Sequence, residues 1–158
     1  MNQEKSREKI IIVDYGSQFT QIIARKIREL GVYSEIINSR TAKKLKKYES
    51  IKGIILSGGP LTVTQKNKAD LDKSILESKI PILGFCYGHQ IMAKKFGGHV
   101  KTSKKREYGA ALLKSITKCS ITKNFFKKKT NMVWMSHQDE VNKIPKGFKR
   151  IASSANSK

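Results

Sequence analysis

The sequence is poor in the residues on which several classes of protein depend. Its 158 residues include two cysteines, three histidines, three prolines and one tryptophan, and only twelve acidic residues. Cys86 and Cys119 are 33 positions apart and belong to no C-x-x-C or His/Cys cluster, so we expect neither a disulfide nor a metal site. Cys119 lies in an alternating stretch and is expected to be a small residue of a strand or of the core.

Long apolar segments are also missing. No run has the length of a transmembrane helix, and the charged N-terminus MNQEKSREK leads directly into a strand-like run without the apolar core of a signal peptide. These absences predict a cytoplasmic protein with no membrane partner. The length predicts one domain at residues 9–158, after a flexible tail at residues 1–8.

Basic residues, in contrast, are abundant. Thirty-three lysines and arginines give a net charge of +21 and a sequence pI near 10.1. Such a charge can indicate nucleic-acid binding. However, lysines occur in nearly every segment, and no RNA-recognition motif, zinc finger or helix-turn-helix accompanies them. We therefore interpret the charge as a lysine-rich surface and do not expect a nucleic acid among the partners.

Strand-like and helical patterns alternate along the first two thirds of the chain. Apolar and β-branched runs predict strands at residues 9–14, 33–38, 51–57 and 81–86. Helical spacing and terminal glycines predict helices at residues 17–30, 41–48, 69–78 and 87–98, with a polar loop at 61–68. The first helix carries its apolar residues at Phe19, Ile22, Ile23, Ile27 and Leu30, and Gly31 is placed to end it.

A different pattern begins at residue 99. Strands are predicted at residues 99–105, 106–122, 131–141 and 148–158, with a short helix near 124–129. The whole pattern predicts an α/β fold, a flavodoxin-like open and mostly parallel sheet with helices on both faces and an antiparallel extension.

Gly84-Phe85-Cys86-Tyr87-Gly88 has the form glycine-x-nucleophile-x-glycine at the junction of a predicted strand and helix. Such an elbow presents its central side chain in a strained and accessible conformation, and the N–H of the next residue, here Tyr87, points to where an oxyanion would form. The positive end of the helix dipole would favour the thiolate of Cys86. The alternative is a structural cysteine in a glycine-rich turn.

SGGP, at residues 57–60, follows another buried strand and lies at the edge of a parallel sheet where active sites gather. Its glycines could donate a second N–H to the same oxyanion, although a plain tight turn is the alternative. These motifs, together with VDYGSQFTQIIARKIRELGVYSE, KREYG and VWMSHQDEV, resemble in order and spacing the class I glutamine amidotransferases, and among them the N-terminal glutaminase domain of bacterial GMP synthases. The resemblance extends over the chain from Lys9 onward.

The resemblance implies a role for several residues. Cys86 would attack the side-chain amide of glutamine, and the N–H groups of Gly59 and Tyr87 would bind the oxyanion. The residues implied to hold the substrate glutamine are Gln90, Ser136 and His137. The resemblance implies no cofactor for this domain. It implies a partner ATP pyrophosphatase domain, in cis or in trans, which uses ATP and Mg²⁺ to convert XMP to GMP.

The base that a cysteine nucleophile requires is not evident. In the class it belongs to a His-x-Glu pair, but the three histidines here, His89, His99 and His137, have Ile91, Lys101 and Asp139 two residues later. His137 with Asp139 is a conceivable substitute, but the resemblance places His137 on the substrate side. His89 is expected on a helix surface and His99 at the start of a strand. Gln138 stands where glycine is common in the family.

Two main readings follow. The chain is expected to stop before the His-x-Glu and before the synthetase domain, as part of a longer GMP synthase. Alternatively, it is a shortened, catalytically inactive remnant or docking module. A cysteine hydrolase of another kind would share the elbow but has no reason to carry DYGSQ, SGGP and WMSH together.

Overall fold

The computed structural model describes residues 7–42, 49–63 and 70–157, and its chain forms two compact units, at residues 1–92 and 93–158. Most of the predicted helix at 41–48 and of the predicted loop at 61–68 lies outside the described residues. The first unit contains a parallel sheet with the strand order β2-β1-β3-β4. The strands are β1 (Lys9–Asp14), β2 (Ser34–Asn38), β3 (Ile51–Leu56) and β4 (Ile82–Gly84).

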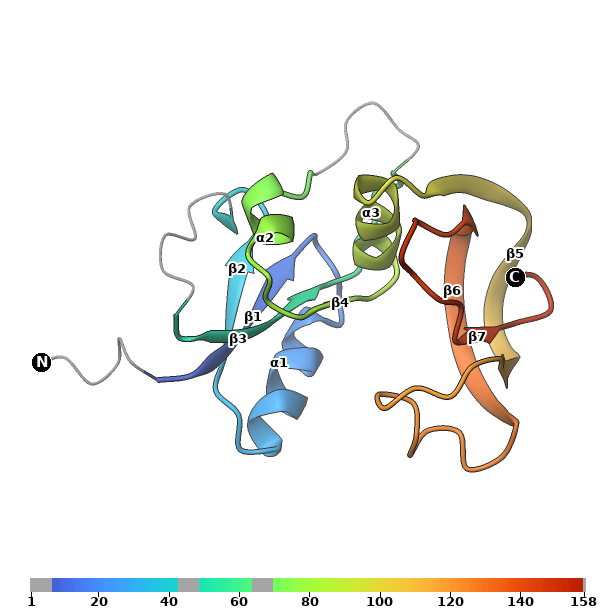
Figure 1. Ribbon diagram of the computed structural model, residues 1–158, viewed down its shortest axis with the longest axis horizontal. Coiled ribbons are helices and arrows are strands. Elements are labelled where there is room, and N and C mark those ends of the chain that lie inside the picture. The colour runs from blue at the N-terminus through green and yellow to red at the C-terminus, as the bar shows by residue number, and fades with distance from the viewer. Residues whose placement is uncertain (1–6, 43–48, 64–69, 158) are drawn as a thin grey trace, which may run out of the picture. The chain divides into compact units, whose positions relative to one another are not determined.

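The two inner strands form the core of this sheet. Ile11, Ile12 and Val13 of β1 are buried beside Ile54 and Leu56 of β3. These side chains alternate between the two faces, so burial of consecutive residues means that both faces are covered. Helices α1 (Thr20–Glu29) and α2 (Lys73–Glu77) lie on opposite sides of the sheet, as Figure 1 shows. The expected parallel sheet with helices on both faces is thus confirmed.

The carboxyl ends of three strands meet at one edge of the sheet. Val13 pairs with Leu56, and Leu56 pairs with Gly84. The segments that follow β1, β3 and β4 therefore begin side by side. They are the DYGS turn (residues 14–17), the SGGP loop (residues 57–60) and the elbow (residues 84–88).

Helix α1 ends where the sequence predicts, but it packs differently. Leu30 is its C-terminal cap and Gly31 adopts a φ of +78°, a conformation that glycine favours. The buried residues of the helix are Thr20 and Ala24, whereas Phe19, Ile22 and Leu30 are exposed. The fully buried side chains of the helix are thus small ones, while the large Ile23 and Ile27 are half-buried.

The second unit is built on a long antiparallel hairpin. It contains β5 (His99–Ser115), β6 (Thr130–Lys143) and β7 (Ala152–Ser153), in the order β6-β5-β7, and α3 (Tyr87–Lys95) precedes it across the boundary between the units. The antiparallel extension is confirmed, although β5 is one continuous strand rather than two. The pairing of β5 with β6 is irregular between Thr102 and Glu107.

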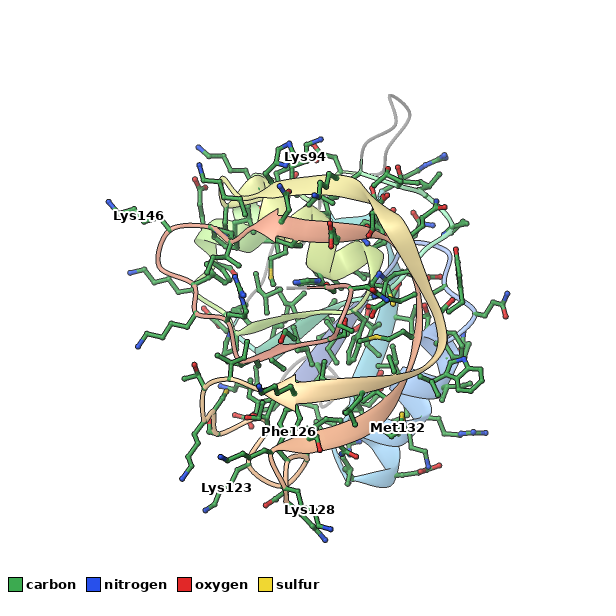
Figure 2. All side chains as sticks on the ribbon, turned by 90° about the vertical axis from the view of Figure 1, so that its right-hand side faces the viewer. Lys94, Lys123, Phe126, Lys128, Met132 and Lys146 are labelled. Atoms are coloured by element: carbon green, nitrogen blue, oxygen red, sulfur yellow. The ribbon has the colours of Figure 1, made fainter. Side chains whose placement is uncertain are left out.

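Two expectations for the hairpin loop are wrong. Residues 116–129 form turns and bends with neither the strand expected up to residue 122 nor the helix expected near 124–129. Cys119 is a half-buried, free thiol of this loop rather than a strand residue. Figure 2 shows Lys123 and Lys128 extending outward from it. The alternation failed as a signal because no strand pairs with these residues.

Candidate active site

The elbow has the conformation that its sequence predicts. Cys86 lies between β4 and α3 with a φ of +46°, in the left-handed region that side chains rarely adopt. A Cβ at Gly84 would lie 2.6 Å from the N of His89, and one at Gly88 would overlap the Leu56 carbonyl oxygen. Only glycine fits at either position, so the close approach of the backbone explains both residues.

Strand β3 holds the elbow from the side. The N–H of Phe85 donates to the Leu56 carbonyl at 2.9 Å, and the N–H of Gly88 donates to the Ser57 carbonyl at 3.0 Å. These two hydrogen bonds bracket Cys86 and offset the cost of its backbone conformation, which is typically about 1–2 kcal/mol.

Cys86 has a free thiol and is an exposed residue, as expected for a nucleophile. Burial by the surrounding atoms raises the pKa of the Cys86 thiol above its ordinary value, in the direction opposite to the effect expected of the helix dipole. The thiol therefore needs a base to release its proton at neutral pH.

The SGGP loop lies against the nucleophile. A Cβ at Gly58 would be 3.4 Å from the Cβ of Cys86. A Cβ at Gly59 would overlap the carbonyl oxygen of Tyr15, so the loop also packs closely on the DYGS turn. Gly59, a predicted oxyanion donor, is thus fixed within a loop adjacent to Cys86.

Asp14 organises the DYGS turn. Its Oδ1 accepts hydrogen bonds from the N–H groups of Gly16 (2.9 Å) and Ser17 (3.3 Å) and from the hydroxyl of Thr20 (2.7 Å). Partial burial alone would raise the pKa of Asp14, but these bonds lower it below its ordinary value of 3.8. The carboxylate thereby ties the end of β1 to the start of α1.

Tyr87 and Gln90 occupy the first turn of α3. Tyr87 is buried, and its ring centroid lies 5.2 Å from that of Tyr15. Gln90 is buried too, and its backbone N–H donates to the Cys86 carbonyl at 3.1 Å. The first unit therefore brings Cys86, Gly59, Tyr87 and Gln90 to the segments around the elbow.

Ser136 and His137 lie on β6, within the second unit. The Nε2 of His137 lies 3.1 Å from the Oε2 of Glu107, and the other carboxylate oxygen of Glu107 accepts a hydrogen bond from the Ser154 hydroxyl at 2.6 Å. Asp139 instead accepts from the hydroxyl of Thr102. The conceivable His137–Asp139 pair is therefore replaced by a His137–Glu107 pair.

The remaining histidines have the positions expected of them. His89 is exposed on α3, and His99 begins β5, where its Nδ1 lies 2.6 Å from the Oδ1 of Asn142. Among the described residues, no group of three or more His, Cys, Asp or Glu side chains could hold a metal ion. Within the same ranges, none of the helices combines the length and apolar content that crossing a bilayer requires.

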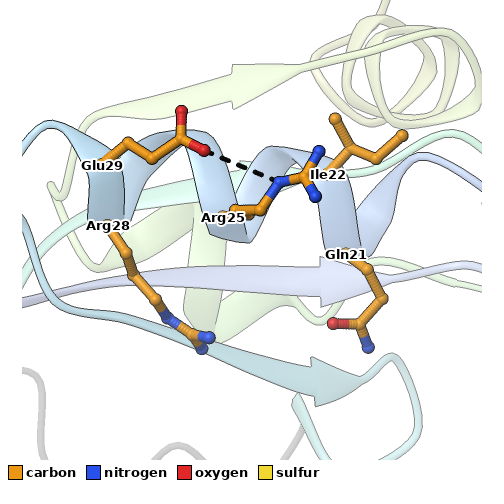
Figure 3. A pocket seen from close by; sticks show the side chains of 5 residues that line it. All are labelled: Gln21, Ile22, Arg25, Arg28 and Glu29. Carbon is orange, nitrogen blue, oxygen red and sulfur yellow. Dashed lines mark ion pairs between the residues drawn. The ribbon is translucent and has the colours of Figure 1, made fainter.

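Two hollows in the described surface are lined by none of the residues predicted for the site. One lies on α1, where Arg25 and Glu29 form an ion pair at 3.7 Å (Figure 3). The other lies in the second unit, next to the hairpin loop, and the six lysines that line it are Lys114, Lys118, Lys123, Lys127, Lys128 and Lys129.

Sequence reasoning missed Asp14 and Ser57, which shape the segments around the elbow, and Glu107, which contacts His137 in the second unit. Asp14 carried a usable signal, because an aspartate followed by glycine and serine before a helix is typical of a capping turn. The contacts of Ser57 with Tyr15 and of Glu107 with His137 carried none, since these partners are distant in the sequence.

Comparison with known proteins relates this geometry to a family. The family model for class-I glutamine amidotransferases matches residues 11–158. GMP synthase (glutamine-hydrolysing) of Brachyspira hyodysenteriae is 47% identical over 150 residues, and that of Lactococcus lactis 46% over 151 residues. Each alignment covers 95% of this chain, which spans only 29% of the length of either relative.

Solved structures have the same fold. A GMP synthase subunit from Thermoplasma acidophilum gives a TM-score of 0.79 at 31% identity, over 96% of this chain and 75% of that one. A glutamine amidotransferase of Thermotoga maritima gives a TM-score of 0.73 at 20% identity, over 96% and 69% of the two chains. The chain belongs to the class-I glutamine amidotransferase family, as a domain homologous to the glutaminase part of GMP synthase.

Proposed function

We propose that this chain is the part of a GMP synthase that releases ammonia from glutamine for the conversion of XMP to GMP. The observation that carries the proposal is Cys86, held at a φ of +46° beside the SGGP loop. The relatives named GMP synthase support the choice of pathway. ATP and Mg²⁺ would act in a partner synthetase domain, and the cytoplasm is the proposed location.

In the proposed reaction, the sulfur of Cys86 attacks the side-chain amide carbon of glutamine. A C–S bond forms and the carbonyl electrons move to oxygen, where the N–H groups of Tyr87 and Gly59 would stabilise the negative charge. Collapse of this intermediate breaks the C–N bond and releases ammonia, and water then converts the thioester to glutamate. Gln90, Ser136 and His137 are the proposed contacts for the substrate.

The base in this scheme takes the thiol proton and returns it to the leaving ammonia. The 158 residues contain no His-x-Glu pair, so in this proposal the base comes from a segment outside them. His137 is not assigned as the base, because the resemblance places it among the contacts for the substrate glutamine.

A glutamine-derived chloroketone tests the proposal, since it alkylates a cysteine that sits at a glutamine site. We expect it to label Cys86 and to spare Cys119, the other free thiol, and we expect glutamine to slow the reaction. Iodoacetamide, which carries no glutamine group, is the matched reagent control. Equal chloroketone labelling of both cysteines, or no protection by glutamine, would contradict the proposal.

A non-catalytic docking module is the second candidate, favoured by the lack of a His-x-Glu pair in the 158 residues. Glutamine-protected labelling of Cys86 separates the two candidates, because a docking module has no reason to bind glutamine beside this thiol. Ammonia release from glutamine by the 158-residue chain, abolished in Cys86→Ser, would eliminate the docking module as its sole function. Glutamine-protected labelling without ammonia release would mean that the site binds glutamine but lacks its base.

A further inference from the structure

Ser57 is the first residue after β3, and it is completely buried. A buried hydroxyl is costly unless it is hydrogen-bonded, so its partners indicate why a serine is present. Its position also matters, because the SGGP loop begins with it and the elbow lies beside it.

The hydrogen bonds of Ser57 reach all three segments at the edge of the sheet. Its Oγ accepts the N–H of Tyr15 at 3.0 Å, from the DYGS turn. Its carbonyl accepts the N–H of Gly88 at 3.0 Å, from the elbow. Its hydroxyl donates to the carbonyl of Gly58 at 2.8 Å, within its own loop.

The hydroxyl has one hydrogen and two possible acceptors. The Oδ1 of Asp14 is 3.4 Å away, whereas the Gly58 oxygen is at 2.8 Å. Asp14 already accepts from Gly16, Ser17 and Thr20. The shorter bond, to the carbonyl of Gly58, therefore takes the hydrogen.

This bond fixes the orientation of one peptide group. The carbonyl of Gly58 and the N–H of Gly59 belong to the same planar unit, and the described residues contain no cis peptide bond. In a trans peptide the C=O and N–H point in opposite directions. A donor that holds the Gly58 oxygen on the Ser57 side therefore holds the Gly59 N–H on the opposite side.

Two glycines in succession make such a restraint necessary, because the peptide between them rotates more freely than any other. A flipped Gly58–Gly59 peptide would present a carbonyl oxygen where the oxyanion needs a donor, and the two negative groups would repel. The loop cannot move away as a whole, since Gly59 packs on the Tyr15 carbonyl and Gly58 lies beside Cys86.

We infer that Ser57 is a positioning residue, whose hydroxyl locks the Gly58–Gly59 peptide so that the Gly59 N–H stays available to the oxyanion formed at Cys86. The inference rests on the proposed function of Cys86 and Gly59. It gives the serine of SGGP a role that acts through the backbone of its neighbours, without contact with the substrate.

The test measures the inactivation of Cys86 by the glutamine chloroketone, separating its binding constant from its maximal rate. In Ser57→Ala we expect the maximal rate to fall roughly tenfold or more, because an oxyanion donor is lost part of the time, while the binding constant changes less than about twofold. The iodoacetamide rate should be unchanged. Ser57→Thr, which keeps the hydroxyl, should recover most of the rate.

Ser78→Ala is the matched control, since the Ser78 hydroxyl also donates to a backbone carbonyl, that of Ile75, at 2.7 Å. It should leave both constants unchanged. An unchanged maximal rate in folded Ser57→Ala would overturn the inference while leaving the proposed function intact. Failure of the wild type to show glutamine-protected labelling would instead overturn the proposed function.

Crystal structures provide a second measurement that does not depend on reactivity. In Ser57→Ala the Gly58–Gly59 peptide should be found flipped or in two orientations. If that variant does not fold, the wild type alkylated by the chloroketone should still show the Ser57 hydroxyl on the Gly58 carbonyl. A single unflipped peptide in Ser57→Ala, or a flipped one in the alkylated wild type, would show that the Ser57 hydroxyl does not fix the orientation of this peptide.

Discussion

The ring of His137 lies 3.1 Å from the carboxylate of Glu107, across the two long strands of the second unit. Both side chains are largely buried, and Glu107 is also bound by Ser154. The pair joins β5 and β6 next to the irregularity in their pairing. The pair is therefore expected to stabilise the segment of β6 that carries Ser136 and His137.

A double-mutant cycle should measure this pair. We expect His137→Ala and Glu107→Gln each to lower the free energy of unfolding, by about 1–3 kcal/mol, because each removes one side of a close contact between two largely buried polar groups. Their coupling energy should be about 1 kcal/mol or more in urea denaturation. The nearby Lys101–Glu140 pair, whose lysine is half exposed, is the control and should couple by less than about 1 kcal/mol. Equal coupling energies for the two pairs would contradict a stabilising role of the His137–Glu107 pair.

Asp14 should give the protein a specific sensitivity to acid. Its folded pKa is lowered below 3.8, so its ionised form stabilises the folded state above that pH, and this contribution is lost as the pH falls through the folded pKa. We expect Asp14→Asn to destabilise the protein by about 1 kcal/mol at neutral pH, with the difference from wild type narrowing below pH 3.8. Glu77→Gln, at an exposed ion pair on α2, should show almost no difference. A difference for Asp14→Asn that is independent of pH would refute the prediction.

The pH dependence of alkylation should report the raised pKa of Cys86. In a Cys119→Ser background, the iodoacetamide rate should rise with pH with a midpoint above that of N-acetylcysteine, because burial favours the neutral thiol. The thiolate fraction at neutral pH is correspondingly small. A midpoint below that of the reference thiol would mean that the helix dipole or a nearby base outweighs burial.

The conformation of Cys86 predicts an unusual order of stabilities. Because residue 86 has a φ of +46°, we expect the Cys86→Gly protein to be more stable than the Cys86→Ala protein by about 1 kcal/mol, although both lack the thiol. In the control, at Ala24 inside α1, we expect the Ala24→Gly protein to be less stable than the wild type by about 1 kcal/mol. Thermal or urea unfolding of the four proteins gives the comparison. If Cys86→Ala proved the more stable of its pair, the elbow would not be strained.

The lysines of the hairpin loop should give only weak binding to nucleic acids. We expect the affinity for a single-stranded RNA to be no tighter than about 10⁻⁶ M at physiological salt and to fall steeply as salt increases. Replacing Lys127, Lys128 and Lys129 by glutamine should reduce the slope of log K against log salt by about 2. Tight, salt-resistant and sequence-selective binding would show that the charge has a dedicated partner.

The parallel sheet was predictable because its signals are local. The apolar run of β1 is buried on both faces, and Gly31 ends α1 through its own backbone preference. The elbow was predictable for the same reason, since Gly84, Cys86 and Gly88 fit together only in one kind of turn. In each case the residue types alone restrict the conformation.

The features that the sequence did not reveal depend on distant partners. Ser57 and Asp14 are 43 positions apart, and Glu107 and His137 meet only because β5 and β6 pair with each other. The loop at residues 116–129 alternates like a strand, but an alternating pattern needs a neighbouring strand to become one. No local pattern contains that information.

The support of the elbow by β3 has a consequence for the order in which the protein forms. Leu56 and Ser57 leave the ribosome well before Phe85 and Gly88, so the carbonyl groups that receive the elbow exist before the elbow does. An isolated peptide with the elbow's sequence would lack these acceptors and would have no reason to keep Cys86 in the left-handed region. In the nascent chain Cys86 is thus an ordinary cysteine. It adopts its reactive geometry only when the elbow forms hydrogen bonds to the completed sheet.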